Sequence, residues 1–297
     1  MEINRVAFSV FGKEIFWYGI IIAFGFVLGV LYALYRAEKV ALTKDNVFDL
    51  ALIGLPLSII CARLFYVLGD LSVLEEGWWK VFAVWEGGIA IYCALIGCAL
   101  TGVIYSYATK IHLGRLCDLA APSLMIGQII GRWGNFVNCE VYGATTNLPW
   151  GMQINGGEMV HPLFLYESLW MLLGLVLLVL YQDKKRRHGE VFCLYLIWYS
   201  VARAFMEMLR DSEYVLKIGT LPLSMLTAIV LLVAAIVTLV LLYKKGKPVN
   251  LKKELVGVKV EEKRKALDAL VEKEAAEEEV LAASKELDEV IAEYMKM

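Results

Sequence analysis

The sequence has no pair of cysteines at CxxC spacing, although it contains six cysteines in 297 residues. Most of them lie inside apolar runs, where cysteine is ordinarily a small buried residue. A disulfide framework or a cysteine metal site is therefore not supported. The sequence also lacks an internal repeat. We expect no separate signal peptide, because the first apolar run follows Lys13 and Glu14 and no small-residue cleavage site comes after it.

Charged residues are scarce, at 20% of the chain, whereas 59% of the residues are hydrophobic. A soluble globular domain is roughly 45–50% apolar, so this excess indicates an integral membrane protein. The net charge of -2 says little about partners, because the charges are unevenly distributed along the chain. No nucleic-acid partner is expected.

Several apolar runs approach the roughly 20 helical residues that a bilayer requires. They cover residues 15–35, 47–68, 88–107, 116–130, 162–181, 191–209 and 218–243. The fourth run is short and the seventh is long. We therefore predict an all-α polytopic membrane protein with about seven transmembrane helices.

Lysine and arginine gather in alternate connections, at residues 36–44, 110–115, 184–187 and 244–247. By the positive-inside rule these connections are cytoplasmic. The N-terminus is then outside and the C-terminus is cytoplasmic, as an odd number of spans also requires.

Two segments differ in character from the spans. Residues 131–161 are rich in glycine, asparagine and proline, which predicts a small extracytoplasmic cap with short strands near residues 150–154. The tail (residues 247–297) is rich in Glu, Lys and Ala, with apolar residues at helical spacing. We predict a membrane domain over 1–246 and, after it, a charged cytoplasmic helix or weak coiled coil without a catalytic role.

Polar residues inside the spans are costly and usually mark function. On this topology every costly polar residue falls in the outer half of the bilayer. The set comprises Tyr18, Arg63, Tyr92, Arg132, Asn135, Asn138, Glu140, His161, Tyr166, Glu167, Arg203, Glu207 and Arg210. This clustering was not used to build the topology, so it supports the topology independently.

Arg203, Glu207 and Arg210 share one helix face at spacings i, i+4 and i+7. Instead of acting in a functional site, Glu207 could form a purely structural ion pair. Arg63 could extend its side chain to the membrane interface by snorkelling. With Arg132, these arginines carry a cationic surplus that needs an anion. At that depth the abundant anion is a phospholipid phosphate, which arginine binds bidentately.

Three further residues each have two possible roles. His161 precedes Pro162 and is either a helix-cap residue or a group for hydrogen bonding and proton transfer. Tyr18 and Tyr92 are either site residues or members of the aromatic belt at the membrane interface.

The blocks around these residues resemble the bacterial prolipoprotein diacylglyceryl transferase family. The longest is Gly131-Arg132-x-Gly134-Asn135-Phe136-x-Asn138-x-Glu140-x-x-Gly143. The other blocks are Trp17-Tyr18-Gly19, Ala62-Arg63-x-x-Tyr66-Val67, Trp85-x-Gly87-Gly88, His161-Pro162-x-x-Leu165-Tyr166-Glu167 and Arg203-x-x-x-Glu207-x-x-Arg210. They occur in family order over about residues 7–243, and the tail lies outside the resemblance.

The resemblance implies a seven-span enzyme of the bacterial plasma membrane. Such an enzyme transfers the diacylglyceryl group of phosphatidylglycerol, taken from the outer leaflet, to the lipobox cysteine thiol of a prolipoprotein whose signal peptide docks beside the lipid. Glycerol 1-phosphate leaves, and no metal or soluble cofactor is implied. We assign catalysis to Arg203, Glu207, Tyr92, Tyr18 and His161. We assign substrate binding to Arg132, which would bind the head group, and to Asn135, Asn138, Glu140, Gly143, Arg63 and Arg210.

The sequence departs from the family at Tyr92, where members usually have a histidine. A phenol has a pKa of about 10 and is a poor base at neutral pH. His161 is an alternative base, and activation of the thiol by the arginine field is another. Two other functions stay open: a lipid flippase or transporter, and a catalytically altered homologue that binds lipoproteins.

Overall fold

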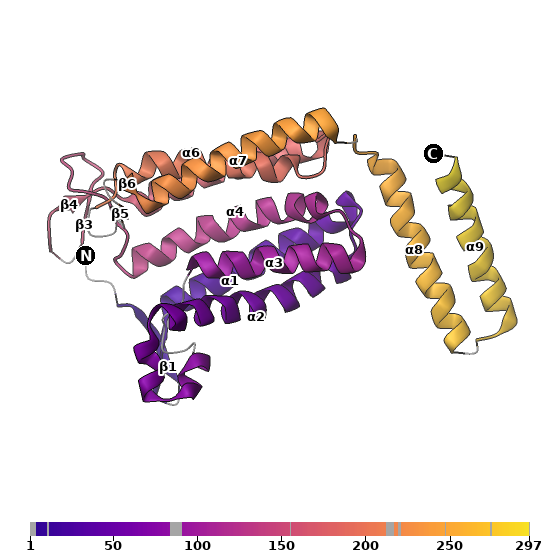
Figure 1. Cartoon of the computed structure of the whole chain (residues 1–297), viewed down its shortest axis with the longest axis horizontal. Helices are drawn as coiled ribbons and strands as arrows, with labels where there is room; N and C mark the ends of the chain where they lie inside the picture. Colours follow the sequence, from indigo (N-terminus) through magenta and orange to yellow (C-terminus); the bar gives the residue numbers. More distant parts are fainter. Residues whose placement is uncertain are drawn as a thin grey trace. The chain divides into compact units, whose positions relative to one another are not determined.

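The computed structural model describes residues 4–10, 12–83, 91–154, 156–211, 217–218, 221–246, 248–273 and 275–296. These residues form nine α-helices and three two-stranded antiparallel sheets (Figure 1). Seven helices follow the seven apolar runs. They are α1 (Trp17–Ala37), α2 (Lys44–Gly69), α3 (Ile91–Thr109), α4 (Leu113–Val137), α5 (Leu163–Tyr181), α6 (Glu190–Glu207) and α7 (Leu223–Lys245).

Five of the described helical segments are long and apolar enough to cross a membrane: Trp17–Val40, Lys44–Gly69, Leu113–Val137, Leu163–Lys184 and Leu223–Lys245. Helix α3 contributes a shorter apolar segment, Cys93–Thr109. Together with the helical content of the chain, these segments confirm the prediction of an all-α polytopic membrane protein. The assignment of seven membrane crossings stays a prediction.

The chain divides into two compact units, which are described separately. The first unit contains residues 1–33 and 112–248. In it α4 packs against α5 and α6, and α6 packs against α7, so these helices lie side by side (Figure 1). Helix α1 approaches α4 closely at Gly29, where a Cβ atom would lie 3.0 Å from the Ser123 carbonyl oxygen. Small residues at such contacts allow helix backbones to come together in a membrane.

The second unit contains residues 34–111 and 249–297. Helices α2 and α3 pair in it, and the tail forms two helices, α8 (Leu251–Glu272) and α9 (Glu277–Met295), that lie antiparallel as a hairpin (Figure 1). We predicted one tail helix. The two helices pack against each other, which leaves Leu270, Val280 and Leu287 half-buried. Helix α8 also packs on the 3-10 turn η1 (Glu38–Val40).

The strands were only partly predicted. The pair β3 (Met152–Gln153) and β4 (Met159–Val160) confirms the short strands near residues 150–154. The pairs β1 (Val6–Val10) with β2 (Lys13–Phe16), and β5 (Lys217–Ile218) with β6 (Leu221–Pro222), were not predicted. As a consequence, the first helix begins at residue 17, two residues after the start of the apolar run.

Helix α4 continues to Val137, beyond the apolar run that ends at residue 130. Arg132 and Asn135 are therefore helical residues, and the connection toward β3 begins at Asn138. The glycines and polar residues of 131–137 suggested a loop by composition. Contacts with other helices stabilise the helix there instead, and these contacts build the site described next.

Candidate functional site

Three arginines and two glutamates gather at one end of the first unit. Arg132 lies near the end of α4, Glu167 in the second turn of α5, and Arg203 and Glu207 in the last turns of α6. Arg210 lies three residues after the end of α6. Because α5 runs antiparallel to α4 and α6, the end of α4, the start of α5 and the end of α6 meet. We call these five residues the arginine cluster.

Glu167 contacts all three arginines of the cluster. Its Oε2 forms an ion pair with Arg132 Nε, and its Oε1 lies 3.3 Å from Arg210 Nη2 and 3.9 Å from Arg203 Nη1. Glu207 Oε2 lies 3.3 Å from Arg203 Nη2 and 3.6 Å from Arg210 Nε. The predicted pairing of Arg203 with Glu207 is confirmed, and the cluster is larger than that pair.

The cluster is buried but not saturated with hydrogen bonds. Arg132 is the most accessible arginine, with 24% of its side chain exposed, against 15% for Arg203 and 7% for Arg210. Among the described residues, Glu167 Oε2, Glu207 Oε2 and Arg210 Nε have charge contacts but no hydrogen bond. Buried polar atoms usually have a hydrogen-bond partner, and Arg210 Nε is a donor that remains open to an acceptor.

The pKa of Arg210 also supports an anion site at the cluster. Burial, and after it the guanidinium of Arg203, lower the pKa of Arg210 from its ordinary value, while Glu167 and Glu207 oppose the shift. A buried cation that is disfavoured by its surroundings is stabilised by an additional anion. The cluster therefore has the charge and the open donors of an anion site.

Sequence reasoning missed the central role of Glu167. The residue was noted as a buried polar group and as the last position of the block that starts at His161, but no site role was assigned to it. Its contacts with α4 and α6 depend on how three helices pack. The signal that was available is its position in the first turns of a span, where a carboxylate needs a partner.

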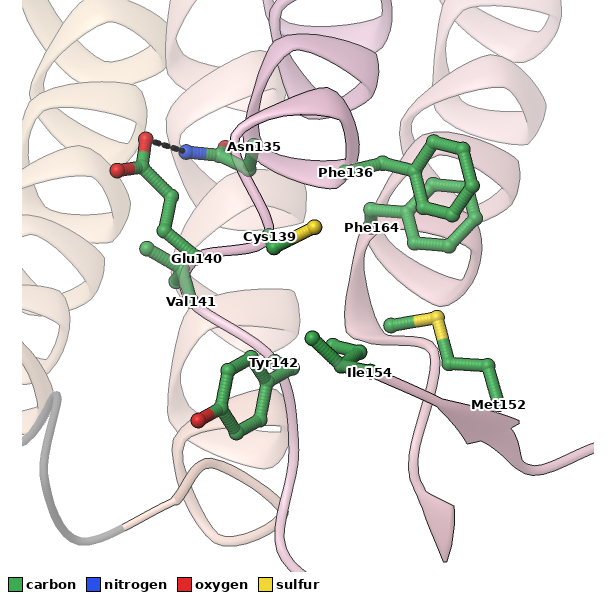
Figure 2. Close-up of a pocket in the computed structure, with 9 residues that line it drawn as sticks. All are labelled: Asn135, Phe136, Cys139, Glu140, Val141, Tyr142, Met152, Ile154 and Phe164. Atoms are coloured by element: carbon green, nitrogen blue, oxygen red, sulfur yellow. Dashed lines mark hydrogen bonds between the residues drawn. The ribbon is translucent and has the colours of Figure 1, made fainter. Parts of the chain in front are cut away.

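A second polar group lies in the connection after α4. Asn135 Nδ2 donates to Glu140 Oε1 over 3.1 Å, and Asn138 Nδ2 approaches the same oxygen at 3.5 Å. Figure 2 shows Glu140 turning toward Asn135, beside a small pocket. The pocket is lined by Asn135, Phe136, Cys139, Glu140, Val141, Tyr142, Met152, Ile154 and Phe164, so its walls combine polar and apolar groups.

The backbone around Glu140 is strained. Cys139 has φ of 52° and Val141 has φ of 56°, in the left-handed region that a β-branched residue rarely adopts. Strain of this kind persists only where surrounding contacts impose it, and it gathers at functional sites. Here the Glu140 amide donates to the Asn135 carbonyl over 3.0 Å, which closes the end of α4 and fixes the position of Glu140.

Tyr18 belongs to the same region. Its ring lies on Gly134 of α4, where a Cβ atom would come within 2.8 Å of the ring carbon Cδ2. Its phenol interacts electrostatically with Glu140 and with Arg132. Gly134 thus provides the space that places Tyr18 between the connection after α4 and the arginine cluster.

Gly143 links three segments of the site. Its amide donates to the His161 carbonyl over 3.0 Å, and it forms an isolated antiparallel bridge with Arg210. A Cβ atom at this position would lie 2.5 Å from His161 Cβ and 2.8 Å from the Leu209 carbonyl oxygen. No side chain fits there, so the role of Gly143 is to hold the backbones before Arg210 and at His161 together.

The ring of His161 contacts Tyr166. His161 Nδ1 lies 3.4 Å from Tyr166 Oη, which also accepts a hydrogen bond of 2.7 Å from Trp150 Nε1. The structure therefore brings His161 to the site through its backbone contact with Gly143. Its ring lies against Tyr166, whose hydroxyl is bonded in turn to Trp150.

Two predicted site residues belong to the second unit. Arg63 is buried in α2, where its Nη2 donates to the Lys80 carbonyl over 2.7 Å and its guanidinium lies over the ring of Tyr66. Arg63 thus has partners within its own unit, and its assignment to substrate binding stays a prediction. The side chain of Tyr92, together with residues 84–90 that hold the Trp-x-Gly-Gly block, lies outside the described residues.

The expectation that every costly polar residue falls in the outer half is wrong. At the opposite end of α4 and α6, Asp118 accepts from Lys185 Nζ at 2.8 Å and from the amides of Gly189 and Phe192 at 2.9 and 3.1 Å. Glu190, only 2% exposed, lies at the same end. We call this group the carboxylate cluster. The sequence pattern concealed it because Asp118 is a single acid in an apolar run.

Glu190 is surrounded by donors. Its Oε2 accepts from the amides of Arg186 and Arg187 at 2.7 and 3.0 Å, and its Oε1 accepts from the hydroxyls of Tyr181 and Tyr243. The carboxylate cluster fixes the connection between α5 and α6, which is a structural role.

Comparison with protein families gives two matches on this chain. The family model described as prolipoprotein diacylglyceryl transferase matches residues 5–241, which include both the arginine cluster and the carboxylate cluster. A model described as Spo0E like sporulation regulatory protein matches residues 258–296, most of the α8–α9 hairpin.

Individual relatives agree with the first match. A Clostridioides difficile protein named phosphatidylglycerol–prolipoprotein diacylglyceryl transferase is 38% identical over 244 residues, 82% of this chain and 97% of the relative. Proteins of the same name from Oceanobacillus iheyensis and Bacillus velezensis are 44% and 39% identical, over 73% and 82% of this chain. The matched regions make up 80% and 94% of those two relatives.

Proposed function

Because this chain belongs to the prolipoprotein diacylglyceryl transferase family, and is thus a membrane-embedded transferase, we propose the reaction that it performs. It transfers the diacylglyceryl group of phosphatidylglycerol to the lipobox cysteine thiol of a prolipoprotein and releases glycerol 1-phosphate. The observation that carries this proposal is the arginine cluster, where buried guanidinium groups outnumber the carboxylates they contact.

The phosphate of the lipid binds to the arginine cluster. It meets Arg132 first, since that side chain is the most exposed of the three, and then Arg203. Arginine suits this task because its planar guanidinium donates two parallel hydrogen bonds to phosphate and stays charged. Glu207 holds Arg203 in position, and Asn135 with Glu140 shapes the connection that lies against the head group.

Chemistry takes place at carbon C3 of the diacylglyceryl glycerol. The cysteine sulfur forms a bond to this carbon, and the bond between C3 and the phosphate oxygen breaks. Negative charge develops on the departing phosphate, where Arg132 and Arg203 stabilise it. Loss of one preorganised donor of this kind typically costs about 10²–10³ in rate.

The lipid enters from the outer leaflet, and the signal peptide of the client docks beside it. This orientation rests on the positive-inside rule, which places the Lys- and Arg-rich connections in the cytoplasm. The packing of α8 on η1 supports it, since η1 belongs to one of those cationic connections and the tail would then lie on the same side.

A transfer assay tests the proposal. Purified protein, phosphatidylglycerol and a lipobox peptide are mixed, and mass spectrometry looks for the diacylglyceryl adduct, with a Cys→Ser peptide as the control. Arg132→Ala should lower the rate by about 10²–10³. Its unfolding should stay cooperative, while Arg132→Lys should retain part of the rate. Lipid movement without an adduct would indicate a flippase, and peptide binding without an adduct would indicate an inactive homologue.

The acceptor of the thiol proton is addressed with the same assay. Tyr92 and His161 are the two candidates, and cysteine needs little help because a few per cent is already thiolate at pH 7. If Tyr92 takes the proton, Tyr92→Phe lowers the rate and Tyr92→His restores it. If His161 takes it, His161→Ala lowers the rate, while Tyr92→Phe leaves it unchanged.

We infer a regulatory rather than a catalytic role for the tail. Two observations support this role: the α8–α9 hairpin forms mainly its own contacts, and most of it matches the family of sporulation regulatory proteins. A chain that ends after Pro248 should transfer diacylglyceryl groups at a rate within about twofold of the full chain, since surface changes away from a site have small effects. A loss of activity as large as that of Arg132→Ala would contradict the inference.

A further inference from the structure

Glu167 lies where the three cations of the site converge. Its two oxygens are divided between Arg132 of α4 on one side and Arg203 and Arg210 on the other. Glu207, in contrast, pairs with arginines four residues before it and three residues after it in the chain. The interhelical charge contacts described for the cluster therefore all pass through the carboxylate of Glu167.

The charges of the cluster do not cancel. Three guanidinium groups and two carboxylates leave a formal surplus of one positive charge, in a site where every side chain is at least three-quarters buried. Glu140 belongs to the adjoining connection, where it accepts from the amides of Asn135 and Asn138. It is counted apart because, among the described contacts, no ion pair joins it to an arginine of the cluster. An anion with one negative charge makes the buried cluster neutral. An anion with two leaves a net negative charge there, and burial of that uncompensated charge is costly.

Substrate and product differ in charge. The phosphodiester of phosphatidylglycerol carries one negative charge, whereas a phosphomonoester carries about 1.5–2 at pH 7 because its second pKa is near 6. In the transfer, sulfur forms its bond to C3, and the electron pair of the broken C–O bond leaves on the phosphate. The proton of the thiol passes to the base and then to water, so the product retains the added charge.

We propose that Glu167 is a resident counter-ion that sets this charge match. With Glu167 ionised, the cluster accepts the singly charged phosphodiester and releases the more highly charged phosphomonoester. Without it, the surplus becomes two positive charges, and the product is retained. The proposal rests on the function proposed above and assigns Glu167 as a positioning and selectivity residue, since it acts on the phosphate through Arg132, Arg203 and Arg210.

The open hydrogen-bonding capacity of the cluster agrees with this role. Glu167 Oε2 lies in contact with Arg132 Nε but forms no hydrogen bond among the described residues, and Arg210 Nε is also without one. Glu167 Oε1 accepts a hydrogen bond of 3.3 Å from Arg210 Nη2, whereas Arg210 Nε stays available for a phosphate oxygen. A carboxylate with a purely structural role would be expected to accept hydrogen bonds at both oxygens, as Glu190 does.

Two soluble inhibitors of the transfer assay test the proposal on the full-length protein. Glycerol phosphate supplies the monoester, and glycerophosphoglycerol supplies the diester head group without acyl chains. The ratio of their inhibition constants measures the preference for one charge over two. The wild-type protein should bind the diester more tightly. Glu167→Gln should lower the monoester constant about tenfold or more, because a unit charge a few ångströms away acts on the second charge as well as the first.

The same variant separates charge selection from structural support. In Glu167→Gln, the KM for phosphatidylglycerol should fall and kcat should also fall, because product leaves slowly. Glu167→Asp should restore the wild-type ratio. Glu190→Gln is the matched control: it removes a buried carboxylate at the other end of the same helices, and it should leave the ratio unchanged.

Three results would overturn the proposal. The first is that the wild-type protein binds the monoester at least as tightly as the diester. This measurement needs no variant, so it tests the proposal even if Glu167→Gln fails to fold. Another is equal weakening of both inhibitors in Glu167→Gln, and the third is the same ratio change in Glu190→Gln. Absence of any adduct from the wild-type protein would instead refute the proposed function itself.

Discussion

Charged side chains are buried at both ends of α4 and α6, but their partners differ between the two ends. At one end, Asp118 and Glu190 are buried carboxylates whose oxygens accept hydrogen bonds of 2.7–3.1 Å from backbone amides and Lys185, and further bonds from tyrosines. At the other end, three arginines share two glutamates at distances that extend from a close contact to 3.9 Å.

The two ends differ in how many of their buried polar atoms lack a hydrogen bond. Each oxygen of Asp118 and Glu190 has a donor, so burial of these charges is compensated within the protein. In the arginine cluster, by contrast, Arg210 Nε and a carboxylate oxygen of each glutamate have no hydrogen bond among the described residues. The carboxylate cluster is thus saturated with hydrogen bonds, whereas the arginine cluster keeps unused hydrogen-bonding capacity.

The largest expected effect concerns catalysis at the arginine end. Arg203→Ala should lower the rate of diacylglyceryl transfer by about 10²–10³, because one donor to the developing phosphate charge is lost. Its thermal unfolding should shift little, since Glu207 keeps Arg210 as a partner. Arg203→Lys serves as the control that preserves the charge. If Arg203→Ala unfolded at a much lower temperature than the wild type, the arginine cluster would also stabilise the fold. The contrast between the two ends would then be wrong.

The next effect concerns stability at the carboxylate end. Glu190→Ala should lower the free energy of unfolding by about 2–4 kcal/mol, because two amides and two tyrosine hydroxyls lose their acceptor in a buried place. Chemical denaturation in detergent measures this loss. The rate per folded molecule should remain near that of the wild type, and a rate loss without destabilisation would assign this end to catalysis.

The smallest effect concerns the position that joins the cap to the arginine cluster. Gly143→Ala should lower the transfer rate about tenfold, or about 1.4 kcal/mol in barrier, because its Cβ displaces the backbone near Arg210 by a fraction of an ångström. Gly156→Ala, in the same cap but with open space around it, is a reference for the general effect of adding a methyl group, although its φ of 75° adds local strain. Equal rates for the two variants would show that the backbone near Arg210 tolerates displacement.

The sequence predicted much of the fold because apolar runs and loop charges report directly on membrane helices. It placed Arg132, Arg203 and Glu207 at one end of the chain's helices, and the structure brings them together. It could not assign Glu167 a role, because a contact with three arginines depends on the packing of three helices. It also missed Glu190, whose donors are partly backbone amides and carry no side-chain signature.

The end of α4 shows a second limit. The stretch after residue 130 has the composition of a loop, yet it is helical through Val137. Gly134 accommodates the ring of Tyr18 there, and Arg132 pairs with Glu167, so tertiary contacts outweigh local propensity. The extracytoplasmic cap predicted over residues 131–161 therefore stays a proposal. Its first residues, 131–137, belong to helix α4.

The pairing of Arg132 with Glu167 also bears on how the chain enters the bilayer. During synthesis, α4 and α5 are made before Arg203 and Arg210 exist, and a lone buried arginine is costly in lipid. Glu167 is the carboxylate that reaches Arg132 within this helical hairpin. Arg132 and Glu167 can therefore insert as a charge-compensated pair, and the cationic surplus of the arginine cluster arises only when Arg203 and Arg210 are added.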